Sequence, residues 1–280
     1  MTTTLRLVEL AGRAVTLEIA EAGAGGRPLL LVHGFSGTKR DFTEDGWLDR
    51  LADVGWHAVA VDQRGHGASE KPAGVDAYSF PILAADLVAL VGALGWSRVT
   101  LLGHSMGGMV AQFVALSTDL LDGLILMDTS HSRPGGLDPE MMRLGRSLVE
   151  EGGTAKLVAT TNELGINALG TPAHERLCAE REGYVEFGEA GTLAASADMW
   201  VAMLDAMLDQ DDRLPALAAL DLPTLVIAGE QDSGFVDQCR ALAATIPCAR
   251  LEIIAEAGHS PQFEAPEAFW DALSGFLSIL

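Results

Sequence analysis

The chain has 280 residues, and 39 acidic against 18 basic side chains give it a formal net charge of −21. Hydrophobic residues make up 49% of it, enough to bury a large core, which excludes a disordered chain. The surplus of negative charge repels phosphate backbones and anionic lipids, so we expect neither a nucleic acid nor a membrane as a partner.

Cysteine usage and the distribution of apolar residues indicate where the protein works. Cys178, Cys239 and Cys248 are odd in number and lack C-x-x-C spacing, which favours free thiols in a reducing compartment. No run approaches the roughly 18 uncharged apolar residues of a transmembrane helix. Charged side chains such as Glu9 and Arg13 interrupt any signal peptide. We therefore expect a cytoplasmic protein.

The periodicity of apolar residues predicts the fold class. The chain opens with two segments, 5–10 and 14–20, in which apolar and polar residues alternate as in an antiparallel hairpin. Short, almost wholly apolar runs follow, typical of strands buried on both faces of a parallel sheet, at 29–32, 58–61, 99–102, 124–127, 225–228 and 251–254. Helical patterns separate them, the clearest at 82–94, 106–116, 239–246 and 266–280. This alternation predicts an α/β fold, with a mostly parallel, mixed sheet of about eight strands flanked by helices.

Residues 131–215 interrupt the alternation, because they show helical patterns but no buried strand. A segment inserted after a strand lies at the carboxyl edge of the sheet, where ligands bind. We therefore expect a helical cap at 131–215 on a core domain formed by 1–130 and 216–280. Four apolar side chains share one helical face of the cap, and they either line a substrate pocket or only pack against the core: Met199, Trp200, Met203 and Met207.

The strongest chemical signal is a G-x-S-x-G pattern, Gly103-His104-Ser105-Met106-Gly107, between a predicted strand and a predicted helix. In that context the serine occupies a sharp turn with its hydroxyl exposed. The glycines let neighbouring backbone pass without a Cβ clash. The helix N-terminus that follows offers N–H groups to a developing oxyanion. Ser105 is therefore the predicted nucleophile.

A serine hydroxyl needs a base, and the base needs an orienting acid. His259 follows a predicted strand and so lies on a loop at the same sheet edge as Ser105. Asp232 also follows a strand, and the chain order serine, aspartate, histidine is the one expected for this architecture. Asp128 ends at the same edge and is a rival acid, and Glu230 is a weaker one. We expect Asp232 to be the acid and His259 the base.

The oxyanion that forms during attack on a carbonyl needs two donors. The turn His33-Gly34-Phe35-Ser36-Gly37 follows the predicted strand 29–32, and its glycines allow a bend that exposes backbone N–H groups. We assign the backbone amides of Phe35 and Met106 as the two donors. The alternative is that this turn is a plain connection from strand to helix.

These residues carry a resemblance to a known family. Over nearly its whole length outside the cap, the sequence resembles the α/β-hydrolase superfamily, in the order His33-Gly34-Phe35, Asp62–Gly67, Gly103–Gly108, Gly229-Glu230-Gln231-Asp232 and Ala257-Gly258-His259. The stretch 62–129 is most similar to bacterial carboxylesterases and enol-lactonases. By this resemblance, residues 62–67 form a structural loop, and Asp62 and His66 take no catalytic step.

Departures from the superfamily's other patterns narrow the chemistry. Dehalogenases and epoxide hydrolases carry an aspartate where Ser105 stands, which disfavours their reactions here. C–C hydrolases often have a glycine–proline–glycine loop that is absent after His33. No Gly-Lys-Ser/Thr follows the glycines at 23–26, and no paired Cys/His spacing occurs. We therefore expect no phosphate-binding loop, no metal and no cofactor.

Together these residues predict a serine hydrolase that cleaves an ester or lactone of a small, mainly apolar substrate. Ser105 would attack the carbonyl, His259 would take and return the proton, and Asp232 would orient the imidazole. C–C bond hydrolysis or peracid formation on the same residues is a second hypothesis. A small-molecule receptor on a hydrolase scaffold is a third. No oligomeric state follows from the sequence.

Overall fold

One mixed β-sheet organises the protein. The computed structural model describes residues 3–135, 138–166 and 170–280, and in these ranges eight strands lie in the order β1-β2-β4-β3-β5-β6-β7-β8. From β1 to β8 their bounds are Thr4–Leu10, Val15–Ala22, Arg27–Val32, Trp56–Val61, Val99–His104, Leu121–Met127, Thr224–Gly229 and Ala249–Ile254. β2 pairs antiparallel with β1 and β4, and all remaining pairs are parallel. The predicted fold class is confirmed.

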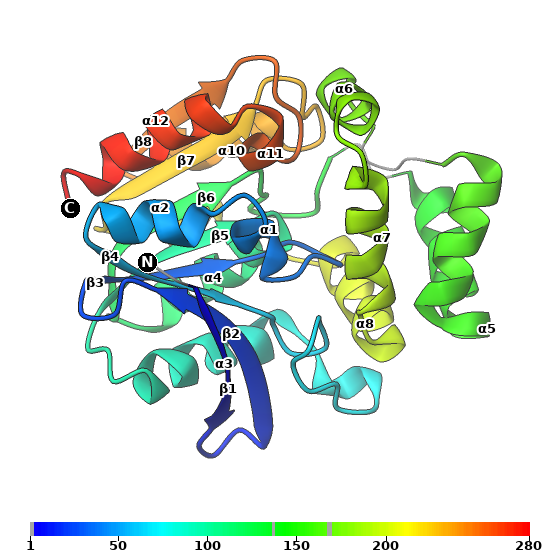
Figure 1. Cartoon of the computed structure of the whole chain (residues 1–280), viewed down its shortest axis with the longest axis horizontal. Coiled ribbons are helices and arrows are strands. Elements are labelled where there is room, and N and C mark those ends of the chain that lie inside the picture. Colours follow the sequence, from blue (N-terminus) through cyan, green and yellow to red (C-terminus); the bar gives the residue numbers. More distant parts are fainter. Residues whose placement is uncertain (1–2, 136–137, 167–169) are drawn as a thin grey trace.

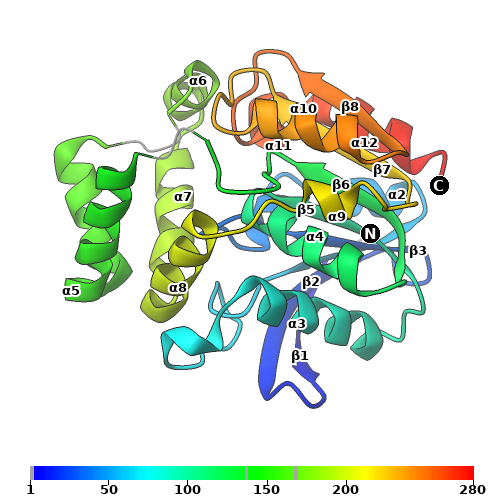
Figure 2. The same cartoon turned by 180° about the vertical axis from the view of Figure 1, so that it is seen from behind.

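Helices cover both faces of this sheet, as Figures 1 and 2 show from opposite sides. One face carries α1 (Arg40–Thr43), α2 (Trp47–Asp53) and α12 (Pro266–Leu277). The other carries α3 (Phe80–Ala93), α4 (Met106–Ser117) and α10 (Val236–Thr245). Each face has its own apolar core, so the central strands are buried on both sides. That double burial explains their nearly uninterrupted apolar sequence.

A run of helices occupies the chain between β6 and β7, and we call it the helical insert. It contains α5 (Pro139–Leu164), α6 (Pro172–Glu180), α7 (Tyr184–Leu193), α8 (Ala197–Leu208) and α9 (Leu214–Leu217). Figure 1 shows α5 to α8 to one side of the sheet. In the described ranges no helix, including α5 with its 26 residues, combines the length and the apolar character that crossing a membrane requires. The division into a core and a cap at 131–215 stays a prediction.

A buried ion pair ties the loop after β4 to the turn after β3. Asp62 is fully buried and accepts hydrogen bonds from Lys39 Nζ at 2.7 Å, from the Lys39 backbone N–H at 2.7 Å and from the Ala68 N–H at 2.9 Å. Glu18 also contacts Lys39 Nζ. Burial tends to lower the pKa of Lys39, but the hydrogen bonds to Asp62 and Glu18 outweigh it and raise the pKa. The ammonium therefore stays charged and holds the loop.

Asp62→Ala should lower the free energy of unfolding by about 3–5 kcal/mol, because it leaves Lys39 buried with half of its partners and two N–H groups without acceptors. Urea denaturation measures the loss. The matched control is Asp237→Ala, which removes an ion pair with Arg240 whose side chains are 83% and 55% exposed. That variant should lose less than about 1 kcal/mol. Equal losses in the two variants would contradict the structural role of Asp62.

Candidate active site

The strand register brings several connecting loops to one edge of the sheet. β3 pairs with β5 through Val32 and Gly103, so the turn after β3 begins beside the turn after β5. β7 pairs with β8 through Gly229 and Ile254, so the loops after β7 and β8 also begin side by side. β6 lies between these pairs in the strand order. Carboxyl ends of parallel strands meet at one edge, where open α/β sheets bind ligands.

Ser105 stands on a strained turn between β5 and α4. Its backbone angles are φ 53° and ψ −119°, a conformation that non-glycine residues rarely adopt. The turn is tight because a Cβ at Gly103 would lie only 2.4 Å from the carbonyl oxygen of Gly107. Two hydrogen bonds hold it, from the Ser105 N–H to the Met127 oxygen at 2.8 Å and from Thr129 Oγ1 to the Ser105 oxygen at 2.7 Å. The hydroxyl therefore has a rigid support.

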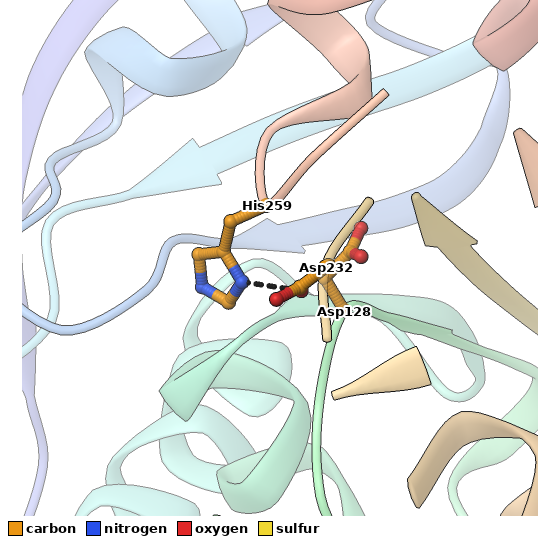
Figure 3. Close-up of side chains that lie close together, drawn as sticks. All are labelled: Asp128, Asp232 and His259. Carbon is orange, nitrogen blue, oxygen red and sulfur yellow. Dashed lines mark hydrogen bonds and ion pairs between the residues drawn. The ribbon is translucent and has the colours of Figure 1, made fainter. Parts of the chain in front are cut away.

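The imidazole of His259 lies between the serine and an acid. Its Nε2 is 2.9 Å from Ser105 Oγ, and its Nδ1 is 2.7 Å from Asp232 Oδ2. Figure 3 shows the contact between His259 and Asp232. All three residues are buried, with exposed fractions of 8%, 6% and 4% for Ser105, His259 and Asp232. With its proton on Nδ1 donated to Asp232, the ring can accept the serine proton at Nε2.

The rival acid, Asp128, lies next to Asp232 but does not hold the imidazole. Its Oδ1 accepts the Gly229 N–H at 2.8 Å. One oxygen of each carboxyl and one nitrogen of His259 nonetheless lie within 4.8 Å of one another, and Figure 3 shows the three side chains together. Burial first, and then the negative charge of Asp232, raise the pKa of Asp128 well above its ordinary range. Glu230 instead accepts a backbone N–H of the loop after β8.

Among the described residues, these same three side chains are the set whose ligand atoms lie close enough to share a metal ion. Both nitrogens of His259 are already engaged, because they contact Asp232 and Ser105. A clustered acid pair alone is weak evidence for a cation. We assign no metal to this group.

The turn after β3 lies against the serine, as the assignment of oxyanion donors requires. A Cβ at Gly34 would be 3.0 Å from the serine Cβ. Burial lowers the pKa of His33, and the neutral ring accepts the Gln63 N–H at Nε2, 3.1 Å away, while Nδ1 lies 2.8 Å from the Gly34 oxygen. Across the ranges that the structure describes, no acceptor takes the N–H of Phe35 or Met106. Both amides are therefore available to a ligand.

Two residues that position His259 escaped the sequence analysis. His104 Nε2 donates to the His259 carbonyl oxygen at 2.7 Å, and burial lowers the pKa of His104 to about 3, so the ring is neutral. Glu264 Oε2 accepts the N–H groups of Gly258 at 2.6 Å and Ser260 at 3.2 Å, on either side of His259. Glu264 ends α11 (Pro261–Glu264). The sequence did contain a signal for the role of Glu264: this acid lies in the first turn of a helix that begins with Ser260-Pro261, where a carboxylate can accept backbone N–H groups.

Glu264→Ala should lower kcat/KM about tenfold or more, because the loop loses the two hydrogen bonds on either side of His259 and the imidazole moves relative to Ser105. Steady-state kinetics on an ester substrate measures the change. Glu264→Gln keeps a carbonyl oxygen at the same position, so it should recover most of the loss. If Ala and Gln lower kcat/KM equally, then Glu264 acts through its charge and does not position the loop.

The apolar face of α8 packs against loops of this edge. The Trp200 ring centroid lies 5.2 Å from that of Phe35, next to an assigned donor amide. A Cβ at Gly65 would be 2.6 Å from the Met199 side chain. All four predicted side chains are buried: Met199, Trp200, Met203 and Met207. They belong to the core on the α4 face of the sheet. A role for them in a substrate pocket stays a prediction.

Comparisons with known proteins agree with this architecture. The model of the alpha/beta hydrolase fold family matches residues 27–266. 3-Oxoadipate enol-lactonase 2 of Acinetobacter baylyi is 27% identical over 271 residues, which cover 96% of this chain and 95% of that protein. A hydrolase of Pseudomonas aeruginosa with a known crystal structure is 29% identical, with a TM-score of 0.81 over 98% of both chains.

A shorter match is more similar in sequence. A serine hydrolase-like protein of Danio rerio is 41% identical over 106 residues, which span about a third of its length, 31%, and 37% of this chain. The family match covers most of the chain, and it includes the strands β3 to β8 and the serine at the turn after β5. The chain belongs to the α/β-hydrolase fold family.

Proposed function

We propose that the protein is a serine hydrolase that cleaves a carboxylic ester or lactone through an acyl-enzyme on Ser105. The observation that carries the proposal is the line of contacts from Asp232 Oδ2 to His259 Nδ1, 2.7 Å, and from His259 Nε2 to Ser105 Oγ, 2.9 Å. Hydroxyl, imidazole and carboxylate in this order, at a helix N-terminus, suit acyl transfer. Similarity to an enol-lactonase over nearly the whole chain supports a lactone or ester bond.

In the proposed reaction Ser105 attacks the substrate carbonyl while His259 takes its proton at Nε2. The oxyanion accepts hydrogen bonds from the backbone amides of Phe35 and Met106. His259 then gives its proton to the leaving alcohol, and a water molecule repeats the attack on the acyl-enzyme. Asp232 holds the Nδ1 proton and stabilises the positive imidazolium. No step requires a metal or an organic cofactor.

We infer that the substrate is small and mainly apolar, because aromatic side chains lie next to His259 and at Phe35, whose backbone amide is an assigned donor. The Phe235 ring lies 4.6 Å from the His259 ring, and Trp200 packs on Phe35. Apolar walls with a few convergent polar groups are typical of small-molecule sites. A preference for highly charged substrates would contradict this part of the proposal.

A fluorophosphonate probe and a substrate panel test the function. The probe should label the wild-type protein and not Ser105→Ala, because only the activated serine hydroxyl reacts. A panel of esters, lactones and a dienoic diketone, run with Ser105→Ala as the blank, should show multiple turnovers on an ester or lactone. Turnover confined to the diketone would indicate C–C hydrolysis instead. Ligand binding without turnover or labelling would contradict a hydrolase.

A further inference from the structure

The mechanism above leaves unused a buried acid that lies beside Asp232 and His259. Asp128 is fully buried, directly after β6, with a positive φ of 43° that a non-glycine residue adopts only under constraint. Its Oδ1 has a donor, the Gly229 N–H at 2.8 Å. Its Oδ2 is buried and has no hydrogen-bond partner among residues 3–135, 138–166 and 170–280. An unpartnered buried oxygen is costly, so this one needs an explanation.

The negative charge of Asp232 and the burial of both residues disfavour a second negative charge on Asp128. One oxygen of Asp128 lies within 4.8 Å of one oxygen of Asp232, and both residues are almost completely buried. In the part of the chain that the structure describes, neither carboxyl accepts a hydrogen bond from a lysine or an arginine. Two carboxylates this close in a poorly solvated site repel so strongly that one of them keeps its proton.

We propose that Asp128 is protonated on Oδ2 at neutral pH and donates this proton in a hydrogen bond to the carboxylate of Asp232. The pair then carries a single negative charge next to the imidazole of His259. The proposal gives the unpartnered oxygen a role, because two facing acceptors can form a hydrogen bond only when one of them holds a proton. The charge belongs to Asp232, since that residue contacts Nδ1 at 2.7 Å.

The groups around Asp128 support this assignment. His259 and Asp232, on the loops after β8 and β7, each have a ligand atom within 4.8 Å of a carboxyl oxygen of Asp128. Cys239 on α10 and Glu264 on α11 are the other titratable groups that interact with it. Cys239 is a neutral thiol, because burial raises its pKa well above the ordinary value. Glu264 adds negative charge and so also disfavours an ionised Asp128. Burial and the negative charge of Asp232 both raise the pKa of Asp128.

Asp128 is thus a positioning residue that acts through Asp232. A hydrogen bond from a neutral acid spreads the charge of Asp232 and weakens its pull on the imidazole proton. It also fixes the Asp232 carboxylate, while Gly229 holds the other oxygen of Asp128. The charge state is a property of the folded protein, whereas the effect on turnover rests on the proposed function.

Infrared difference spectroscopy reads the proton directly, without turnover. Burial raises the pKa of Asp41 to about 7, so this acid also contributes a protonated carboxyl band near neutral pH. The spectrum of the wild type minus that of Asp128→Asn cancels this contribution and should show the C=O stretch of a protonated carboxyl group. The matched control is Asp237→Asn, an exposed acid that should leave the band in place. Absence of the band from the difference between the wild type and Asp128→Asn would overturn the proposal.

The pH profile of kcat/KM gives a second readout. Asp128→Asn replaces a neutral acid with a neutral amide that can both accept from Gly229 and donate to Asp232, so the acid-side midpoint should move by less than about 0.3 pH unit. If Asp128 were ionised, the variant would remove a negative charge near His259, and the midpoint would fall by about 1 pH unit or more.

Asp128→Val is the complementary variant, because valine fills the space of Asp128 but cannot donate a hydrogen bond to Asp232. The Asp232 carboxylate then holds the imidazole proton more strongly, so the acid-side midpoint should rise. An unchanged or lower midpoint in this variant would contradict the proposed hydrogen bond. The infrared band distinguishes a failure of this proposal from a failure of the proposed function. If the band is missing but turnover depends fully on Ser105, only the proposed proton on Asp128 is contradicted. If Ser105→Ala still turns over substrate, the proposed function is contradicted and the band is unaffected.

Discussion

Ser105→Ala should lower kcat/KM for p-nitrophenyl acetate by at least about 10³-fold. The alanine removes the oxygen that lies 2.9 Å from His259 Nε2 and leaves no group that can form an acyl-enzyme. Substrate binding should change little, so the loss should fall on kcat. Release of p-nitrophenol, followed by absorbance with the two proteins at equal concentration, measures the effect.

Ser117→Ala is the control for this substitution. Ser117 ends the same helix, α4, is exposed, and donates its hydroxyl only to carbonyl oxygens of its own helix. Its removal should leave turnover within about twofold of the wild type, since surface substitutions of this kind are nearly neutral. An active Ser105→Ala protein would mean that the reaction does not pass through this serine.

Gly229→Ala should lower kcat/KM by about 10²-fold or more and destabilise the protein. Gly229 ends β7 beside the loop that carries His259, and a Cβ there would lie 1.9 Å from the Gly258 oxygen and 2.7 Å from the Ala257 oxygen. Backbone cannot approach a Cβ so closely, so the loop must shift. A displacement of about 1 Å at a reacting group costs roughly two orders of magnitude in rate.

The comparison variant is Gly275→Ala in α12, where an added Cβ meets nothing within 4 Å. Alanine favours a helix over glycine by about 0.5–1 kcal/mol, so this variant should unfold at a higher temperature than the wild type and keep the wild-type kcat/KM. Thermal unfolding followed by circular dichroism, with kinetics on both variants, tests the pair. Wild-type kinetics in Gly229→Ala would contradict the tight contact between the two loops.

Local patterns predicted the central elements of the fold well and its margins poorly. The apolar runs identified β3 to β7, because double burial removes polar residues from these strands. β8 begins at Ala249, earlier than predicted, since it is an edge strand in which Arg250 and Glu252 face solvent. α2 was not predicted, because it has only seven residues and three of them are charged. Its apolar side chains pack against β2 and β4, and Trp47 also contacts Phe269 of α12.

The chain order of serine, aspartate and histidine led to the prediction of Ser105, Asp232 and His259, and it left Asp128 as the rival acid. Asp128 and Asp232 both follow a strand that ends at the same edge, and local sequence treats them alike. The structure places Asp232 at 2.7 Å from the imidazole and Asp128 on the Gly229 amide. His104 and Glu264 hold the His259 loop through contacts that no motif encodes.

The sequence by itself determined the strand–helix alternation, the turn that exposes Ser105 and the candidates for base and acid. These features follow from periodicity and from residue types near one another in the chain, whose conformational preferences are local. Only the tertiary structure decided which acid contacts His259 and which buried carboxyl lacks a partner. Distances, loss of water and repulsion between charges depend on segments more than a hundred residues apart, such as β6 and the loop after β7, and these come together only on folding.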